Sequence, residues 1–332
     1  MRSPSLPTSS WPLEKGGGRP DTFLRAPTVD LFSAPDDVIL ILGVPHEATK
    51  LSRRGAREAP AAIREATWMY HFAVTEMAEG VVVDIDGGTE SRWKAAPLVD
   101  AGDVELGPQI DENVATIRQA ATHAASGGRF PVFLGGDHFV TYPLASGVRE
   151  SRAARFGYLH IDMHLDLADT VPGYGTYASG TPVRRLLEDR VIAPVSCAII
   201  GVESFQHKNE WSYAQEHQID VTSAKRLRRE GIEQVLNRLG TKLTTGTEGV
   251  YLSLDIDVLN RTFAPGTGNA VGTEGLLPDE LMEVLHHVRQ WPLVAMDLVE
   301  TSPPLDPSGR TAGMAASAIL SVLHERLFED IG

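Results

Sequence analysis

The 332-residue chain has a single cysteine, Cys197, so it can form neither an intrachain disulfide nor a metal site built on several cysteines. Basic residues are scarce: 30 Lys and Arg against 44 Asp and Glu give a formal charge of −14. A nucleic-acid partner requires a basic surface that neutralises phosphates, so this balance argues against one. Apolar runs such as residues 38–44 are far shorter than the roughly 20 residues of a membrane helix. We therefore expect a cytoplasmic protein that binds neither nucleic acid nor membranes.

The first 35 residues show no apolar period, and residues 3–20 are rich in Ser, Pro and Gly. No apolar core follows Arg2 and Lys15, so a signal peptide is not expected. We predict a poorly ordered arm over residues 1–35, with packing of the arm on a neighbouring subunit as the alternative. No composition shift divides residues 36–332, and we expect them to form one domain.

Short apolar strands alternate with helical patterns from residue 36 onward. The predicted strands cover residues 38–44, 131–134, 156–161, 195–200, 249–254 and 293–299. The predicted helices cover residues 60–67, 110–126, 181–188, 223–239, 279–288 and 311–327. This alternation predicts a three-layer α/β/α fold with a mainly parallel central sheet. In such sheets the chemistry lies just beyond the carboxyl ends of the strands.

Residue types that bind metals follow four of the predicted strands, at the point where each strand ends. They are His138 after the second strand, Asp162, His164 and Asp166 after the third, Asp255 and Asp257 after the fifth, and Glu300 after the sixth. Residues two apart in an extended segment point to the same side, so these side chains are expected to converge. A single pair of this kind more often caps a turn, but four converging carboxylates would repel strongly without a counter-ion. Two divalent cations would relieve that repulsion, and these ligands suit Mn²⁺ better than structural Zn²⁺.

These motifs resemble those of the ureohydrolases, the family of arginase, agmatinase and formimidoylglutamase. The resemblance covers residues 38–327, and its main motifs are Gly135-Gly136-Asp137-His138, Asp162-Met163-His164-Leu165-Asp166, Ser253-Leu254-Asp255-Ile256-Asp257 and Ala264-Pro265-Gly266-Thr267-Gly268. It implies an arginase-like fold for residues 36–332, a homo-oligomer (trimer or hexamer), and hydrolysis of a C–N bond in a linear amidine or guanidine.

The resemblance also implies a ligand set for two Mn²⁺ per subunit, with Ni²⁺ or Co²⁺ as alternatives. One metal is held by His138, Asp162, Asp166 and Asp255, and the other by Asp162, His164, Asp255 and Asp257. A hydroxide between the metals then attacks the amidino carbon. Asp166 carries the proton to the leaving nitrogen, and Glu300 pairs with the cationic N–H groups of the substrate. Capping of a loop is the alternative role for Glu300.

One departure from the family pattern concerns the substrate. Ser179 stands where arginases and agmatinases have a histidine that shuttles protons, and serine has no imidazole to do so. The string from Gly180 to Arg185 looks more like formimidoylglutamases. We therefore favour a formimidoylglutamate-like substrate, with agmatine or a guanidino acid that releases urea as the alternative. His46 is a candidate substitute base, although an ordinary loop histidine is the simpler interpretation.

A second departure concerns the recognition of a substrate carboxylate. Ala168 occupies a position where relatives that act on amino acids place Asn or Arg. This leaves carboxylate binding to other residues, of which Arg184 and Arg185 are candidates, with a solvated helix face as the alternative. Two other functions stay open: a zinc-dependent deacetylase, which shares the fold but has fewer carboxylates, and a non-catalytic, metal-stabilised family member.

Overall fold

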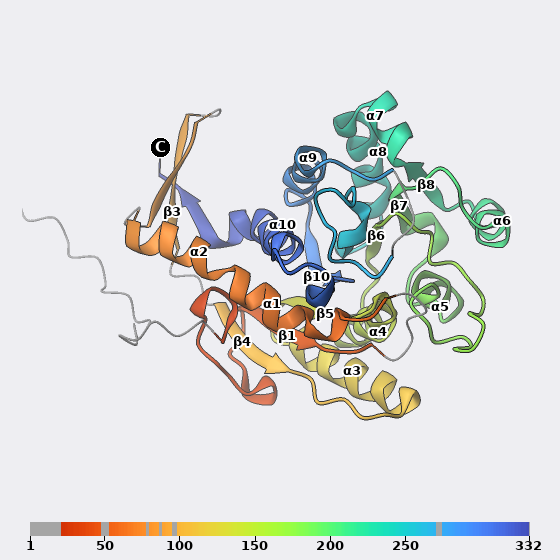
Figure 1. Ribbon diagram of the computed structural model, residues 1–332, viewed down its shortest axis with the longest axis horizontal. Coiled ribbons are helices and arrows are strands. Elements are labelled where there is room, and N and C mark those ends of the chain that lie inside the picture. Colours follow the sequence, from red (N-terminus) through yellow and green to blue (C-terminus); the bar gives the residue numbers. More distant parts are fainter. Residues whose placement is uncertain are drawn as a thin grey trace, which may run out of the picture.

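The computed structural model describes residues 21–47, 53–77, 80–85, 88–94, 98–269 and 274–331. Its centre is an eight-stranded sheet in the order β4-β1-β5-β10-β9-β6-β7-β8, in which all paired neighbours are parallel (Figure 1). The strands are β1 (Ile39–Val44), β4 (Leu98–Asp103), β5 (Phe130–Gly135), β6 (Gly157–Ile161), β7 (Cys197–Val202), β8 (Asp220–Ser223), β9 (Val250–Asp255) and β10 (Leu293–Val299). The six predicted strands are confirmed within two residues at each end, whereas β4 and β8 were not predicted.

Helices cover both faces of this sheet, which confirms the predicted three-layer fold. One face carries α1 (Ala59–Ala66), α7 (Ala224–Glu230), α8 (Ile232–Thr244), α9 (Pro278–Val288) and α10 (Arg310–Leu327). The other carries α3 (Ile110–Ala124), α4 (Thr141–Arg152), α5 (Pro182–Glu188) and α6 (Lys208–Glu216). Alternate strand residues feed the two apolar cores: Ile41 packs on the α1 side and Leu42 on the α3 side. No helix in these ranges is long and apolar enough to cross a membrane.

The structure corrects the predicted helix over residues 223–239. Its apolar period is real, but the backbone turns at Gly231, whose φ of +90° is readily adopted only by glycine. The segment therefore forms two helices, α7 and α8, on either side of that residue.

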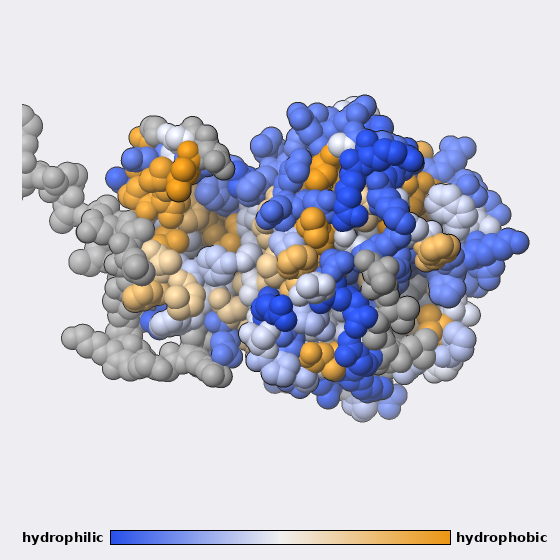
Figure 2. Space-filling view, turned by 45° about the horizontal axis from the view of Figure 1, so that its top comes forward, coloured by the Kyte–Doolittle hydropathy of each residue, from blue (hydrophilic) through white to orange (hydrophobic). Residues whose placement is uncertain are grey.

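A small second sheet was not predicted. It consists of β2 (Val81–Asp84), β3 (Thr89–Trp93) and β11 (Phe328–Asp330), paired antiparallel in the order β11-β3-β2. It projects from the main body beside the short helix α2 (Trp68–His71), far from the centre of the large sheet (Figure 1). Hydrophobic surface gathers on this projection, where Val83 and Ile85 are 56% and 90% exposed (Figure 2).

The N-terminal region is partly packed. Residues 1–20 of the predicted arm lie outside the described residues. Residues 21–35, which we expected to be poorly ordered, instead pack on the edge of the sheet: Phe23 and Leu24 are buried. The N–H of Phe23 donates to Asp100 Oδ2 at 2.8 Å, and the N–H of Leu24 donates to Thr67 Oγ1 at 2.8 Å. Burial of the two apolar side chains and these two long-range hydrogen bonds account for the order.

Candidate metal centre

The predicted site residues converge at the carboxyl ends of four adjacent central strands, β5, β10, β9 and β6. His138 begins a short 3-10 turn after β5, and Asp257 lies in a similar turn after β9. Asp162 directly follows β6, and Glu300 directly follows β10. Neighbouring parallel strands end at the same edge of the sheet, and this is why residues more than 100 positions apart meet.

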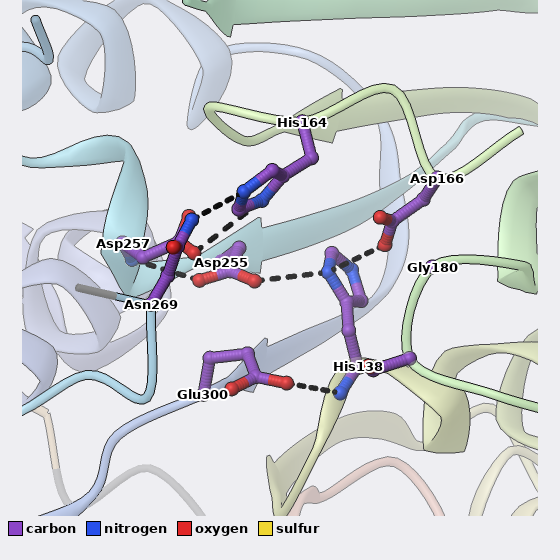
Figure 3. Close-up of a pocket in the computed structure, with 9 residues that line it drawn as sticks. His138, His164, Asp166, Gly180, Asp255, Asp257, Asn269 and Glu300 are labelled. Carbon is purple, nitrogen blue, oxygen red and sulfur yellow. Dashed lines mark hydrogen bonds and ion pairs between the residues drawn. The ribbon is translucent and has the colours of Figure 1, made fainter. Parts of the chain in front are cut away.

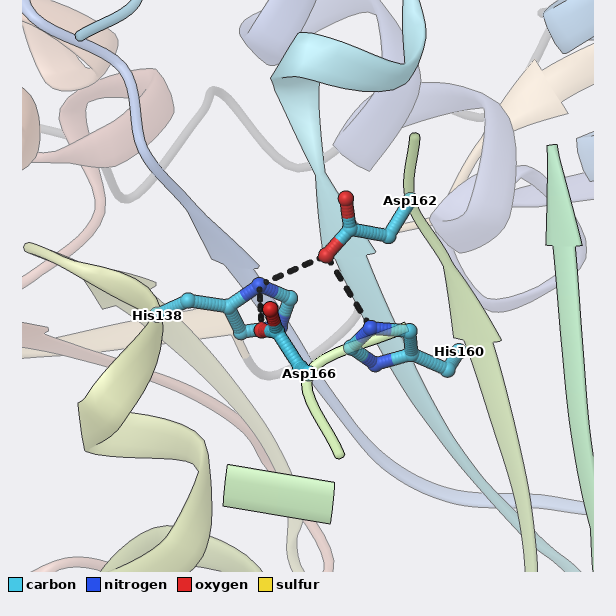
Figure 4. Close-up of side chains that lie close together, drawn as sticks. All are labelled: His138, His160, Asp162 and Asp166. Atoms are coloured by element: carbon cyan, nitrogen blue, oxygen red, sulfur yellow. Dashed lines mark ion pairs between the residues drawn. The ribbon is translucent and has the colours of Figure 1, made fainter. Parts of the chain in front are cut away.

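The ring of His138 faces three carboxylates at once. Its Nδ1 lies 3.0 Å from Asp162 Oδ2 and 3.1 Å from Asp166 Oδ2 (Figure 4). The same atom lies 3.0 Å from Asp255 Oδ2 (Figure 3). A ring nitrogen holds at most one hydrogen, so it cannot satisfy three carboxylates. His138 Nδ1, Asp162 Oδ2 and Asp166 Oδ2 are also buried without a hydrogen-bond partner among the described residues. Oxygens and an imidazole nitrogen arranged in this way fit the coordination sphere of a divalent cation.

A second group of ligand atoms shares Asp162 with the first. His164 Nδ1 lies 3.4 Å from Asp257 Oδ2 (Figure 3). The same nitrogen lies 3.1 Å from Asp162 Oδ1. The other Asp257 oxygen, Oδ1, is buried without a hydrogen-bond partner among the described residues. These three side chains are close enough to hold a cation together. The two groups therefore suit a pair of cations that share the Asp162 carboxylate.

Crowding of charged groups in this cluster raises the pKa values of one histidine and two carboxyl groups. Burial alone would lower the pKa of His138, but the surrounding carboxylates, Asp166 foremost, raise it well above its usual value. Burial raises the pKa of Asp166, and the neighbouring Asp162 raises it further. Burial and the nearby Asp255 likewise raise the pKa of Asp257. Carboxylates crowded in this way resist ionising together, and bound cations remove that resistance.

His160 is a member of this cluster that sequence reasoning missed. Its Nε2 lies 3.0 Å from Asp162 Oδ2, and its ring stacks on that of His138 with centroids 4.7 Å apart (Figure 4). It precedes Asp162 by two positions, so the alternation rule that grouped the predicted ligands also applies to it. It was missed because it lies inside β6, whereas attention was directed to the residues after each strand.

A cavity of about 210 Å³ opens beside the metal ligands. Its lining residues are His138, His164, Asp166, Ser179, Gly180, Asp255, Asp257, Asn269 and Glu300 (Figure 3). Ser179 thus lies in the wall of the pocket, whereas its expected role in substrate binding stays a prediction. Asn269 was not predicted; its side-chain amide contacts Nε2 of His164, and it directly follows the motif that ends at Gly268.

Glu300 reaches the pocket from the end of β10. The carboxylate oxygen Oε1 accepts a hydrogen bond from the backbone N–H of His138 at 3.0 Å, and the residue is 6% exposed. Its φ is +67° and that of Asp166 is +52°, values that are uncommon for residues with a side chain. Such backbone strain is concentrated at functional sites, because the surrounding structure must compensate for it.

Arg184, Arg185 and His46 are not among the described residues that line the pocket, and each contacts other side chains. The Arg184 guanidinium lies over the ring of Tyr213, 3.8 Å from its centroid. It is also held by Glu188, so it is engaged on the surface of α5.

Arg185 and His46 are likewise engaged elsewhere. Arg185 donates to Asp169 Oδ1 at 3.0 Å. His46 Nδ1 lies 3.0 Å from Asp137 Oδ1, so His46 supports the loop that precedes His138.

Comparisons with known proteins agree on one family. The sequence model described as "Arginase family" matches residues 37–324. Proclavaminate amidinohydrolase from Streptomyces clavuligerus is 31% identical over 311 residues, which are 92% of each chain. Formimidoylglutamase from Bacillus subtilis is 28% identical over 290 residues, which are 85% of each chain.

Solved structures of both relatives share the fold. The S. clavuligerus structure aligns with a TM-score of 0.78 at 28% identity and covers 92% of this chain and 97% of its own. The B. subtilis structure aligns with a TM-score of 0.81 at 24% identity and covers 97% of this chain and 96% of its own. The two relatives are named for different substrates.

Proposed function

Because this chain belongs to the Arginase family, we propose that it is an Mn²⁺-dependent hydrolase of a C–N bond in a small cationic amidine or guanidine. The observation that carries the proposal is the convergence of three carboxylate oxygens, 3.0 to 3.1 Å from His138 Nδ1, at the base of a pocket that also contains Glu300. Two Mn²⁺ held there by His138, Asp162, His164, Asp166, Asp255 and Asp257 would supply an activated water molecule.

The protein groups of the pocket have distinct roles in this proposal. Asp166 accepts a proton from the attacking water at its carboxylate and passes it to the leaving nitrogen, a role that its place in the lining of the pocket allows. Glu300 pairs with the cationic N–H groups of the substrate and orients the planar amidine. Two Mn²⁺ would neutralise the four ligating aspartates, so Glu300 is the lining acid whose charge favours a cationic substrate over a neutral one.

Ser179 favours formimidoylglutamate or a similar substrate. It lies in the pocket wall at the position where arginases and agmatinases have a histidine, and the string from Gly180 to Arg185 resembles that of formimidoylglutamases. One of the relatives described above is a formimidoylglutamase, in agreement with this choice. Water attack on the formimidoyl carbon would release formamide and glutamate.

A guanidino substrate is the second candidate, and the composition of the pocket favours it. None of the described lining residues is a lysine or arginine, and Arg184 and Arg185 are engaged elsewhere. The glutamate part of formimidoylglutamate carries two carboxylates, which usually require cationic partners. Agmatine has no carboxylate and a guanidino acid such as 4-guanidinobutyrate has one, so both need fewer cationic partners. Hydrolysis of either would release urea.

A product-resolved assay separates these candidates. Mn²⁺-loaded protein is incubated with formimidoylglutamate, agmatine, 4-guanidinobutyrate, arginine and guanidine, and formamide and urea are measured separately. Formamide from the first substrate supports the first candidate, and urea from one of the others supports the second. Protein that contains two Mn²⁺ per subunit and releases neither product would contradict the proposal and favour a non-catalytic, metal-stabilised member of the family.

A further inference from the structure

A buried polar layer crosses the central strands one step below the metal ligands. Ser253 on β9 is directly opposite His160 on β6 and Asp297 on β10. All three side chains are fully buried. Ser253 and His160 each precede a proposed ligand, Asp255 and Asp162, by two residues and therefore lie on the same face of the sheet.

Asp297 is the unusual member of this layer, because it is a fully buried acid for which the described residues provide no lysine or arginine partner. Its Oδ1 accepts a hydrogen bond from the Ser253 hydroxyl at 2.8 Å, and its Oδ2 accepts one from the Tyr251 hydroxyl at 2.7 Å. Burial of a carboxylate costs free energy unless hydrogen bonds or ion pairs compensate for the lost hydration. The burial of Asp297 therefore suggests that this residue has a function.

The contacts of Ser253 define which nitrogen of His138 carries a hydrogen. His138 Nε2 lies 3.1 Å from Ser253 Oγ. Since the one hydroxyl hydrogen of Ser253 is donated to Asp297, its oxygen must accept the hydrogen bond from His138 Nε2–H. A neutral imidazole with its hydrogen on Nε2 has a lone pair on Nδ1, the atom that faces the carboxylates of the proposed metal site.

We propose that Asp297 is a positioning residue that, through Ser253, holds His138 in the tautomer able to bind a cation with Nδ1. The inference rests on the metal-binding part of the proposed function. Asp297 does not line the pocket, so its effect passes through Ser253 and His138. Without Asp297, the Ser253 hydroxyl can donate its hydrogen to His138 Nε2 instead. His138 then adopts the other tautomer, whose hydrogen on Nδ1 prevents that nitrogen from binding a cation.

Cation binding tests this inference without any substrate. Purified full-length Asp297→Leu and Ser253→Ala variants are titrated with Mn²⁺ by calorimetry and with Co²⁺ by visible absorption. Tyr251→Phe is the matched control, since it removes the other hydrogen bond to the same carboxylate but leaves the one from Ser253. We expect about 10- to 100-fold weaker binding of one cation in the first two variants, as is typical when a partner of a ligating histidine is lost. The control should lose thermal stability but keep its cation affinity.

The test compares the cation affinity of Asp297→Leu and Ser253→Ala with that of the control, Tyr251→Phe. Wild-type affinity in folded Asp297→Leu and Ser253→Ala, or an equal loss of affinity in Tyr251→Phe, overturns the inference. If Asp297→Leu does not fold, Ser253→Ala applies the same test to the next group in the chain of hydrogen bonds. Wild-type protein that binds two cations but hydrolyses no substrate contradicts only the proposed hydrolysis, whereas protein that binds no divalent cation contradicts both proposals.

Discussion

Glu300 illustrates at the scale of one residue how binding of substrate and binding of metal can be separated. Glu300→Gln retains an oxygen that can accept the hydrogen bond from the His138 N–H but removes the negative charge that faces the pocket. We expect the Mn²⁺ content to stay unchanged and kcat/KM to fall by about 100- to 1,000-fold, the range for loss of one stabilising contact in a transition state. Metal analysis and steady-state kinetics on the substrate that the product assay identifies measure both quantities.

The matched control is Glu283→Gln on the exposed surface of α9, which makes the same chemical change away from the pocket. Its metal content and kinetics should equal those of the wild type. Full activity in Glu300→Gln would remove Glu300 from the substrate site, and loss of metal from it would assign this residue to the metal centre instead.

Single residues also show where prediction from the sequence stopped. Asp162, His164 and Asp257 meet as expected, but the expected reason is wrong. Residues 162–164 form bends and Asp257 lies in a 3-10 turn, so neither segment is the extended chain in which residues two apart share a side. His160 and Asp297 lie inside strands. The sequence around an acid or a histidine in a strand does not indicate which side chains it will contact. Their roles depend on the neighbouring strands, and strand order cannot be read from alternation along one strand.

At the scale of elements, α4 was missed because it does not look like a surface helix. Residues 141–148 are all buried, so the first two turns of the helix have no exposed face, and they contain both Pro143 and Gly147. Pro143 lies in the first turn, where its missing N–H has no intrahelical acceptor. Gly147 packs against α3: a Cβ there would lie 2.3 Å from Arg118 O. Close contact between the two helices therefore outweighs the low helix propensity of glycine.

This contact yields a stability prediction. Gly147→Ala should lower the free energy of unfolding by about 1 to 3 kcal/mol, because the added methyl group forces α3 and α4 apart. Gly313→Ala is the control, since Gly313 lies in α10 and a Cβ there meets no atom within 4 Å. The control should be stabilised by about 0.5 to 1 kcal/mol through helix propensity. Urea unfolding measures both, and equal effects of the two changes would show that helix packing at Gly147 is unimportant.

At the scale of the whole molecule, the burial of Cys197 in β7 predicts an alkaline limit to stability. Burial raises the pKa of this thiol from about 9 to about 12. Between those values the native state keeps a proton that the unfolded chain has lost, so the free energy of unfolding falls as pH rises. Each pH unit costs about 1.4 kcal/mol, so we expect a loss of about 2 kcal/mol from Cys197 between pH 8 and 10.5.

Urea unfolding of wild type and Cys197→Ala at the two pH values tests this expectation. Cys197→Ala loses packing contacts at every pH. The decrease in its free energy of unfolding between pH 8 and 10.5 should be smaller than the decrease in the wild type by about 2 kcal/mol. Equal decreases in both proteins would show that the thiol ionises in the native state as easily as in the unfolded chain.

The sequence by itself determined the alternation of strands and helices, the parallel sheet and the set of residues at the strand ends. The reason is that residue type and the period of apolar residues, two in strands and 3.6 in helices, are local properties of the chain. Only the tertiary structure decided the rest. It placed β5, β10, β9 and β6 side by side, so that residues from four distant segments face one another. It also placed the Arg184 guanidinium over the Tyr213 ring and aligned Ser253 with Asp297 on neighbouring strands. These outcomes depend on strand order, register and competition among partners, and all three arise only when distant parts of the chain pack together.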